Sequence, residues 1–564
     1  MARMGRHGWT TLLLMAMGIA RASAAPTAEA AVYLDAHSGA PRLELGAARA
    51  GAVATGAFED GLNTSGWGVL DVSTAPSVND TVQHFAAGMV EGFLTSRHIH
   101  ATYLNALGYV FKSNVSEPAL KFLADQRAWA RAQVRVHSGD LFWRHAGALL
   151  AQLDGLERGY ALAAEQGLVV SLPESAFLIL NGVGDLFQIM PAVDMHRRPD
   201  FQKMSSGELQ DLVKEQGMCS GIVKVPGDFE DLFMSHSSWF SYANTNRIFK
   251  HYQFHWQMPA SAQRISFSSY PGYLESLDDF YMMSSGLGMV QTSNNILNAS
   301  LYDLVKPESL LAWQRVRIAS AMASSGREWY EIFQRHASGT YVNQYMVVDF
   351  KLFKPRTALL DGTLWVVEEI PGLVVGADQT ETLRRGYWPS YNVPFYPEVY
   401  KRSGYTDDRL GPYGSYELAP RAKIFRRDQA SVVDMDSLKR LMRYANYSDP
   451  YARNEETGDV DYAAAICMRG DLAKEGNGYA GGCYDTKVVS HLHGFWNLTA
   501  EVVNGPSSVA SDGTGGKSGN APFAWRFADE TPHVDLPEVY NFGFITTRPR
   551  KMCIGCDQLG IIHV

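Results

Sequence analysis

Cys219 stands where a polar segment meets a run of residues that favour strands. Asp200–Met218 is rich in polar side chains and glycine, so we expect an exposed linker there. The sequence CSGIVKV follows over Cys219–Val225, and its valines and isoleucine favour a β-strand. A cut between Met218 and Cys219 would therefore leave a strand that begins with a free α-amino group and a thiol.

An amino-terminal cysteine of this kind can perform nucleophilic catalysis. Its α-amino group has an ordinary pKa of about 7.7–8.0, so it can accept the thiol proton near neutral pH. The thiolate then attacks an acyl carbonyl, which is the chemistry of the N-terminal-nucleophile hydrolases. The alternative is a free cysteine that only fills the core, and the spacing alone does not separate the two.

The other four cysteines form natural local pairs. Cys467 and Cys483 bracket a glycine-rich loop, and Cys553 and Cys556 form a CxxC pair near the end of the chain. We expect both pairs to be disulfides, which leaves Cys219 as the odd thiol. The Cys553–Cys556 CxxC motif is accompanied by no second CxxC motif and by no histidine cluster, so we expect no metal and no cofactor.

The first residues predict the secretory route. Basic residues precede the apolar run 9–20, which is too short to span a bilayer, and Ala22-Ser23-Ala24 has the form of a cleavage site. We expect a signal peptide over residues 1–24, no transmembrane anchor, and a secreted or lysosomal protein. Glycosylation is then expected at the Asn-x-Ser/Thr sites Asn63, Asn79, Asn114, Asn298, Asn446 and Asn497.

Composition describes an ordinary folded protein with an acidic balance. The chain has 564 residues, of which 46% are hydrophobic and 19% charged, and its formal net charge is −9. Such a chain can bury a substantial core. No long basic run is present, so a nucleic-acid partner has no electrostatic support.

The order of the predicted elements indicates an α+β fold. Apolar residues at three- and four-residue steps predict helices over residues 81–167. Cys219–Val225 and residues 231–236 predict one hairpin, and residues 345–353 and 363–370 predict another. One or two helices are expected between the hairpins, over residues 307–335. Strands and helices in this order pack as layers.

Several separated blocks resemble one family, the phospholipase B-like (lamina-ancestor) proteins of the N-terminal-nucleophile superfamily. Two of these blocks, Tyr484–Lys487 and Pro537–Phe542, are most similar to the first phospholipase B-like subgroup. The blocks are Cys219-Ser220 with Pro226-Gly227, His236–Trp239 with Arg247-Ile248, Ser268–Gly272 with Leu277–Phe280, Gly339–Gln344, Ile370–Gly372, Gly386–Tyr391, Tyr484–Lys487 and Pro537–Phe542.

The resemblance implies a four-layer αββα sandwich and a chain that cuts itself before Cys219. The largely helical fragment 25–218 and the fragment 219–564 would share one domain and stay associated. The implied activity is hydrolysis of fatty acyl esters of glycerophospholipids through a thioester on Cys219.

The same resemblance implies roles for individual residues. Cys219 matches the nucleophile, and His236 and Trp239 match residues that line the pocket. Asn343 is the candidate donor to the oxyanion. Thr292 or Ser293 matches a polar residue that approaches the nucleophile. Arg247 is either a substrate contact or half of a buried ion pair.

Two other functions remain open at this stage. The same cysteine chemistry serves amidases that act on N-acyl amides or peptides, and the acyl pocket would look alike. A catalytically idle glycoprotein that binds lipid would keep the fold without turnover.

Overall fold

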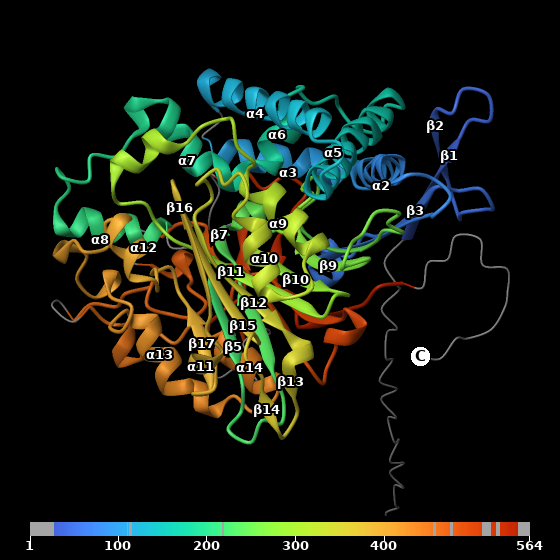
Figure 1. Cartoon of the computed structure of the whole chain (residues 1–564). Coiled ribbons are helices and arrows are strands. Elements are labelled where there is room, and N and C mark those ends of the chain that lie inside the picture. The colour runs from blue at the N-terminus through green and yellow to red at the C-terminus, as the bar shows by residue number, and fades with distance from the viewer. Residues whose placement is uncertain are drawn as a thin grey trace, which may run out of the picture.

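The structure is a computed structural model that describes residues 27–109, 111, 115–216, 219–454, 458–473, 478–509, 520–525 and 531–550. Within these residues two β-sheets pack face to face, with helices on both outer sides (Figure 1). The α+β class and the sandwich of layers predicted from the sequence are confirmed.

The larger sheet has eleven strands in the described part of the chain, in the order β16-β15-β12-β11-β10-β9-β8-β4-β3-β1-β2. Neighbours are antiparallel except β4 and β8, which run parallel. The strands are β1 (Thr27–Leu34), β2 (Pro41–Leu45), β3 (Ala54–Glu59), β4 (Trp67–Thr74), β8 (Arg247–Gln253), β9 (Arg264–Ser269), β10 (Phe280–Met283), β11 (Leu287–Ser293), β12 (Asn343–Asp349), β15 (Leu364–Ile370) and β16 (Leu373–Asp378).

In chain order, the first two strands of the smaller sheet form the predicted hairpin after Cys219. Its order is β17-β5-β6-β19-β20-β23, and all its pairs are antiparallel. The strands are β5 (Ser220–Lys224), β6 (Phe233–Ser237), β17 (Tyr387–Ser390), β19 (Asp485–Ser490), β20 (Ala500–Asn504) and β23 (Ile545–Thr547). Three short pairs lie outside both sheets: β7 (Trp239–Ser241) with β18 (Gly481–Cys483), β13 (Phe353–Lys354) with β14 (Ala358–Leu359), and β21 (Phe523–Ala524) with β22 (Val539–Tyr540).

Helices complete the four layers. The larger sheet is covered by α2 and α10, with α5 and α9 packed against them, and α14 covers β6 and β19 of the smaller sheet. The helices are α1 (Leu62–Ser65), α2 (Asp80–Leu94), α3 (Ser96–Tyr109), α4 (Glu117–Val136), α5 (Leu141–Glu165), α6 (Ala176–Asn181), α7 (Val183–Val193), α8 (Ser206–Gln216), α9 (Ala312–Met322), α10 (Gly326–Phe333), α11 (Thr380–Leu383), α12 (Pro397–Arg402), α13 (Pro420–Asp428) and α14 (Met435–Met442).

Glycines let α2 and α5 pack in backbone contact. A Cβ atom on Gly88 would lie 2.0 Å from the Gln152 carbonyl oxygen, and one on Gly155 would lie 1.9 Å from the Phe85 carbonyl oxygen. Any larger residue at these positions would separate the helices. The N-terminal helical layer is therefore held close to the sheet on which α2 lies.

The polar segment before Cys219 is partly helical, which corrects the expected linker. The Ser205 hydroxyl accepts from the Glu208 N–H at 3.3 Å, and the Glu208 carboxylate accepts from the Ser205 N–H at 2.8 Å. This reciprocal pair is a capping box that starts α8. Leu209 and Val213 are buried at a spacing of four residues, so one face of α8 packs on the core.

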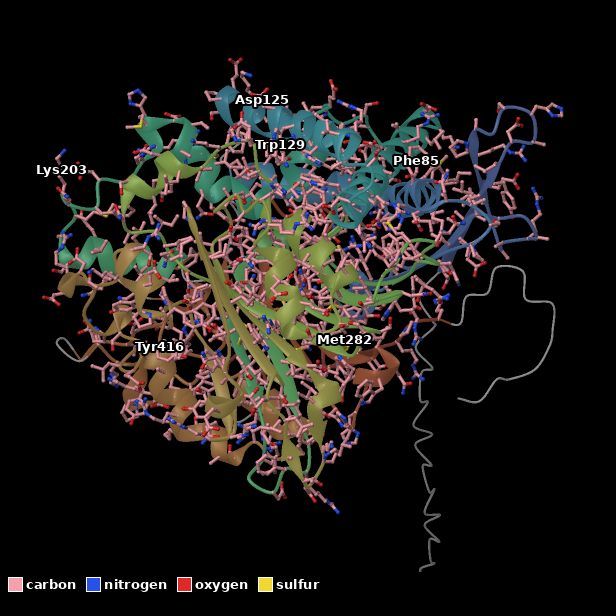
Figure 2. The ribbon with its side chains drawn as sticks, in the orientation of Figure 1. Phe85, Asp125, Trp129, Lys203, Met282 and Tyr416 are labelled. Carbon is pink, nitrogen blue, oxygen red and sulfur yellow. A yellow bond between two sulfur atoms is a disulfide. The ribbon has the colours of Figure 1, made fainter. Side chains whose placement is uncertain are left out.

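The space between the sheets is filled by apolar side chains. Figure 2 shows Met282 among the packed strands, whereas Lys203 and Asp125 lie at the periphery. Val223 and Met234 from the smaller sheet belong to the same buried cluster as Met282. Polar and charged groups interrupt this core near one end of β5, beside Cys219.

Candidate active site

The main chain holds Cys219 in a strained conformation at the start of β5. Its φ angle is 83°, in the left-handed region that a residue with a side chain rarely adopts. Such a conformation costs about 1–3 kcal/mol and persists only where neighbouring structure enforces it. Cys219 is 3% exposed, and its thiol is free.

Burial keeps the Cys219 thiol in its neutral form. It raises the pKa of the thiol to about 12, although a hydrogen bond from the Trp239 backbone N–H lowers the pKa in part. A neutral thiol is a weak nucleophile, so attack on a carbonyl needs a base that takes its proton.

Arg421 connects Cys219 to the loop after β17. Its guanidinium donates to the Cys219 carbonyl oxygen at 2.6 Å, to the Tyr391 carbonyl oxygen at 2.9 Å and to the Asn392 Oδ1 atom at 2.5 Å. It also lies 4.3 Å from the centre of the Trp239 ring. Burial lowers the pKa of Arg421 to about 10, which leaves it a cation at neutral pH.

Arg421 and Asn392 were not predicted from the sequence. Arg421 is one of several basic residues of α13 and lies 202 positions from Cys219, so no spacing linked the two. Asn392 has a φ of 70°, and a positive φ suits asparagine better than most residues.

Trp239 packs against a disulfide. The Trp239 indole donates to the Ile466 carbonyl oxygen at 3.1 Å, and β7 pairs with β18 so that Trp239 lies opposite Cys483. Cys467 and Cys483 are bonded with an S–S distance of 2.03 Å, which confirms this predicted pair. The disulfide and Trp239 share one buried cluster.

Thr292 approaches the start of β5. The Thr292 methyl group would lie 3.6 Å from a Cβ atom on Gly221, and the Thr292 hydroxyl is 2.6 Å from that of Ser390. Ser293 contributes its carbonyl oxygen instead, which accepts from the Asn392 amide at 2.6 Å.

Asn343 faces away from the start of β5. Its amide donates to the Tyr345 hydroxyl at 2.9 Å, and the Tyr345 ring contacts Trp329 and Phe333 of α10 on the helix-covered side of the sheet. Because side chains alternate along a strand, Met346 points to the other sheet and approaches Gly221. The structure therefore does not bring Asn343 to Cys219.

His236 and Arg247 belong to a buried charged cluster between the sheets. Arg247 lies 2.9 Å from Asp278 and 2.9 Å from Asp485. Of the two roles left open for it, a substrate contact or a buried ion pair, this arrangement is the buried ion pair. Lys487 joins the same two carboxylates and contacts His236 Nδ1 at 3.0 Å. Burial alone would raise the pKa of Asp278, but Arg247 and Lys487 outweigh this and lower it.

A small cavity adjoins Trp239. It has a volume of about 30 Å³, and its lining includes Trp239, Asn392 and Arg421 together with Val213 and Lys214 of α8. A water molecule needs about 10–15 Å³ of such space. In the uncut chain this cavity admits water-sized groups only.

Several expected sites fall on residues that the structure does not describe. The signal peptide over residues 1–24, the scissile residue Met218, Asn114 and the Cys553–Cys556 pair lie outside the described residues. The side chains of the remaining sequons reach the surface, with Asn298 half-buried and the others exposed: Asn63, Asn79, Asn446 and Asn497. In the described part of the chain, no helix combines the length and apolarity needed to cross a membrane.

Together these features define a class of protein. A two-sheet α+β sandwich carries a free, buried thiol on a residue of strained conformation just before a strand, with a guanidinium bound to the carbonyl oxygen of that residue. This combination suits transfer of an acyl group to sulfur.

Comparison with known proteins shows the family. The Phospholipase B family model matches residues 54–547. "Phospholipase B" of Crotalus adamanteus is 42% identical over 88% of each chain, and "Phospholipase B-like 1" of Homo sapiens is 41% identical over 88% of this chain and 87% of its own length. "Phospholipase B-like protein B" of Dictyostelium discoideum is 34% identical over 87% and 85%. The chain belongs to the phospholipase B family.

Proposed function

We propose that this protein removes fatty acyl chains from glycerophospholipids through a thioester on Cys219, after cutting itself before that residue. The observation that carries the proposal is the free, buried Cys219 at a strained peptide position, held by Arg421. Membership of the phospholipase B family supports the substrate class.

Maturation begins with the thiol. Sulfur attacks the Met218 carbonyl carbon, the thiol proton passes to the amide nitrogen of Cys219, the peptide C–N bond breaks, and the acyl group is left on sulfur. Water then hydrolyses the thioester, which leaves a carboxylate on Met218 and a free amine and thiol on Cys219. The left-handed φ of Cys219 favours this step because breaking the peptide bond releases the local strain.

In the mature enzyme the α-amino group of Cys219 takes the thiol proton. The thiolate attacks the ester carbonyl, the alcohol leaves with that proton, and water completes the cycle. The Arg421 guanidinium donates to the Cys219 carbonyl oxygen and to the Asn392 Oδ1 atom, so we assign Arg421 to positioning the acyl group and its developing charge and Asn392 to holding Arg421 in place. Thr292 is the better candidate of its pair for a polar contact, and we assign no chemical step to Asn343.

The same proposal includes the secretory route. A disulfide suits an oxidising compartment, and the exposed sequons can accept glycans there. We propose removal of residues 1–24, glycosylation at the predicted sites, and a secreted or lysosomal destination.

Two variants test the nucleophile. Cys219→Ala should give one uncut chain, whereas the wild type should give two fragments with a new terminus at Cys219. Cys219→Ser should cut slowly and lose at least about 10²-fold in hydrolysis, because the hydroxyl ionises less readily and sits differently from sulfur. Amino-terminal sequencing and electrophoresis provide the measurement. Normal cutting and parental hydrolysis by Cys219→Ser would refute the role of Cys219.

The substrate is tested on the matured protein. Release of fatty acid from a diacyl phospholipid should exceed release from an N-acylethanolamine, with Cys219→Ala as the blank. A preference for the amide would show that the protein is an amidase that uses the same site, and not an esterase. Turnover of neither, with normal self-cleavage, would favour the idle lipid-binding protein.

A further inference from the structure

Lys487 lies between two carboxylates and a histidine in the interior of the sandwich. Its Nζ atom is 2.6 Å from Asp278, 2.7 Å from Asp485 and 3.0 Å from Nδ1 of His236. The side chains of Lys487 and Asp485 are 0% exposed. Lys487 and His236 are directly opposite each other in β19 and β6, so the sheet itself sets their contact.

The contact with Lys487 determines which ring nitrogen of His236 carries a proton. Lys487 also donates to the Ser238 hydroxyl at 2.5 Å, so its three N–H donors face four partners; its ammonium group has no lone pair and cannot accept a hydrogen bond from Nδ1. Nδ1 is therefore unprotonated, and in a neutral imidazole the proton then lies on Nε2. Burial and the Lys487 charge both lower the pKa of His236 well below its ordinary value, which keeps the ring neutral.

Among the described residues, the Nε2 atom of His236 makes no hydrogen bond of good geometry, although the residue is 0% exposed; the backbone of Gln291 is near enough to raise the pKa of the ring in part. A buried donor without a partner costs about 1–3 kcal/mol. The cluster lies close enough to Cys219 for Asp278 and Lys487 to act on the pKa of its thiol. His236 lies opposite Gly221 in the β5–β6 pair, two residues along the chain from Cys219, so this N–H donor belongs to the end of β5 that carries the nucleophile.

We propose that Lys487 is a positioning residue that holds His236 as the Nε2–H form, so that His236 acts as a hydrogen-bond donor toward the acyl oxygen and not as the base. This inference rests on the proposed function and deepens it. It leaves proton abstraction in the mature enzyme to the α-amino group of Cys219, and it gives the Tyr484–Lys487 block a part in the site.

Nuclear magnetic resonance of ¹⁵N-histidine-labelled full-length protein tests the inference directly. The Cys219→Ala chain provides a uniform uncut sample, and a second sample with His236→Gln as well identifies the His236 signals by their loss. We expect the signal of an unprotonated Nδ1 and a protonated Nε2 at neutral pH. A proton on Nδ1, donated to the Ser238 hydroxyl 3.5 Å away, would overturn the inference. A doubly protonated ring would overturn it as well.

Paired substitutions test the donor in function. The glutamine amide nitrogen can stand where Nε2 does, whereas the asparagine amide nitrogen stands nearer Nδ1. His236→Gln should therefore keep the self-cleavage rate within about tenfold, and His236→Asn should lower it about 10²-fold, the usual effect of losing one oxyanion donor. Equal losses in the two variants would contradict a donor at Nε2.

Lys487 is tested by the same readouts. Lys487→Met should lower self-cleavage about 10²-fold, and its spectrum should show His236 as a mixture of forms. Lys487→Arg should keep the Nε2–H signal because arginine also only donates. An unchanged His236 spectrum in folded Lys487→Met would refute the positioning role. If that variant does not fold, the spectrum of the Cys219→Ala chain still decides the protonation of His236.

These outcomes separate the inference from the proposed function. Maturation of Cys219→Ala at the normal rate would remove Cys219 as nucleophile without changing the His236 spectrum. A protonated Nδ1 in a protein that cuts itself and hydrolyses phospholipid would refute the role of His236 as an Nε2–H donor and would still support the proposed function.

Discussion

At the residue scale, Arg421 organises the main chain around the nucleophile. One guanidinium contacts Cys219, Tyr391 and Asn392 and also covers the Trp239 ring. Such a planar fork of donors is particular to arginine, since lysine offers a single charged nitrogen. The geometry of the strained peptide therefore depends on one side chain from a distant helix.

Arg421→Lys should lower the self-cleavage rate by about 10²-fold, because a displacement of about 1 Å at a reacting group has an effect of this size. Arg426→Lys is the matched control, since Arg426 lies on the same helix with an exposed side chain. The rate is measured by electrophoresis after a synthesis pulse. Equal rates in both variants would show that Arg421 does not position Cys219.

The buried thiol makes a prediction about pH. With a pKa near 12, Cys219 of the uncut chain should react with iodoacetamide about 10³-fold more slowly at neutral pH than an exposed thiol. Its rate should keep rising tenfold per pH unit beyond pH 9, where an exposed thiol has levelled off. Mass spectrometry distinguishes the uncut chain from the cut one in a single sample. A rate that levels off near pH 8–9 would contradict this environment.

At the element scale, the short pair β7–β18 links the disulfide to the site. Cys483 ends β18 and lies opposite Trp239, whose ring supports Arg421. The Arg443 guanidinium also approaches the Cys467 sulfur at 3.5 Å. The disulfide thus fixes the position of Trp239, against which Arg421 packs.

Replacement of both Cys467 and Cys483 by serine should lower the free energy of unfolding by about 3 kcal/mol, the value expected for closing a loop of this length. Self-cleavage should also slow at temperatures where the variant remains folded, because Trp239 loses its support. Denaturant unfolding and electrophoresis measure the two effects. A stability loss with an unchanged cleavage rate would mean that the disulfide does not position Trp239.

At the scale of the whole molecule, the two expected fragments share one sheet. The part before Cys219 supplies β1–β4, and β4 pairs in parallel with β8 from the part after it. A buried ion pair between Glu91 and Lys250, 2.6 Å long, also joins the two parts. Cutting one peptide bond leaves these contacts in place.

We therefore expect the cut protein to migrate as one particle in native gel filtration and as two fragments in non-reducing denaturing electrophoresis. Glu91→Gln should favour separation of the fragments in mild denaturant, since breaking a buried ion pair costs about 3–5 kcal/mol. Asp125→Asn is the control, because the Lys121–Asp125 pair is exposed. Separation of the wild-type fragments without denaturant would contradict the shared core.

Prediction from the sequence was most successful where the pattern is local. The hairpin after Cys219, the helices over residues 81–167 and the Cys467–Cys483 pair all follow from neighbouring residues, and the structure contains each of them. The segment before Cys219 was less well predicted, because the capping box of α8 is a weak signal among polar residues.

The amino-acid sequence by itself determined the α+β class, the family and Cys219 as the candidate nucleophile, because these depend on local periodicity and on unusual residues in long blocks. Only the tertiary structure decided what surrounds the thiol. It bound Arg421 to the Cys219 carbonyl oxygen and to Asn392, turned Asn343 to the far face of its strand, and joined Lys487 to His236. Such contacts depend on strand register and sheet packing between residues up to 251 positions apart, which local sequence patterns do not encode.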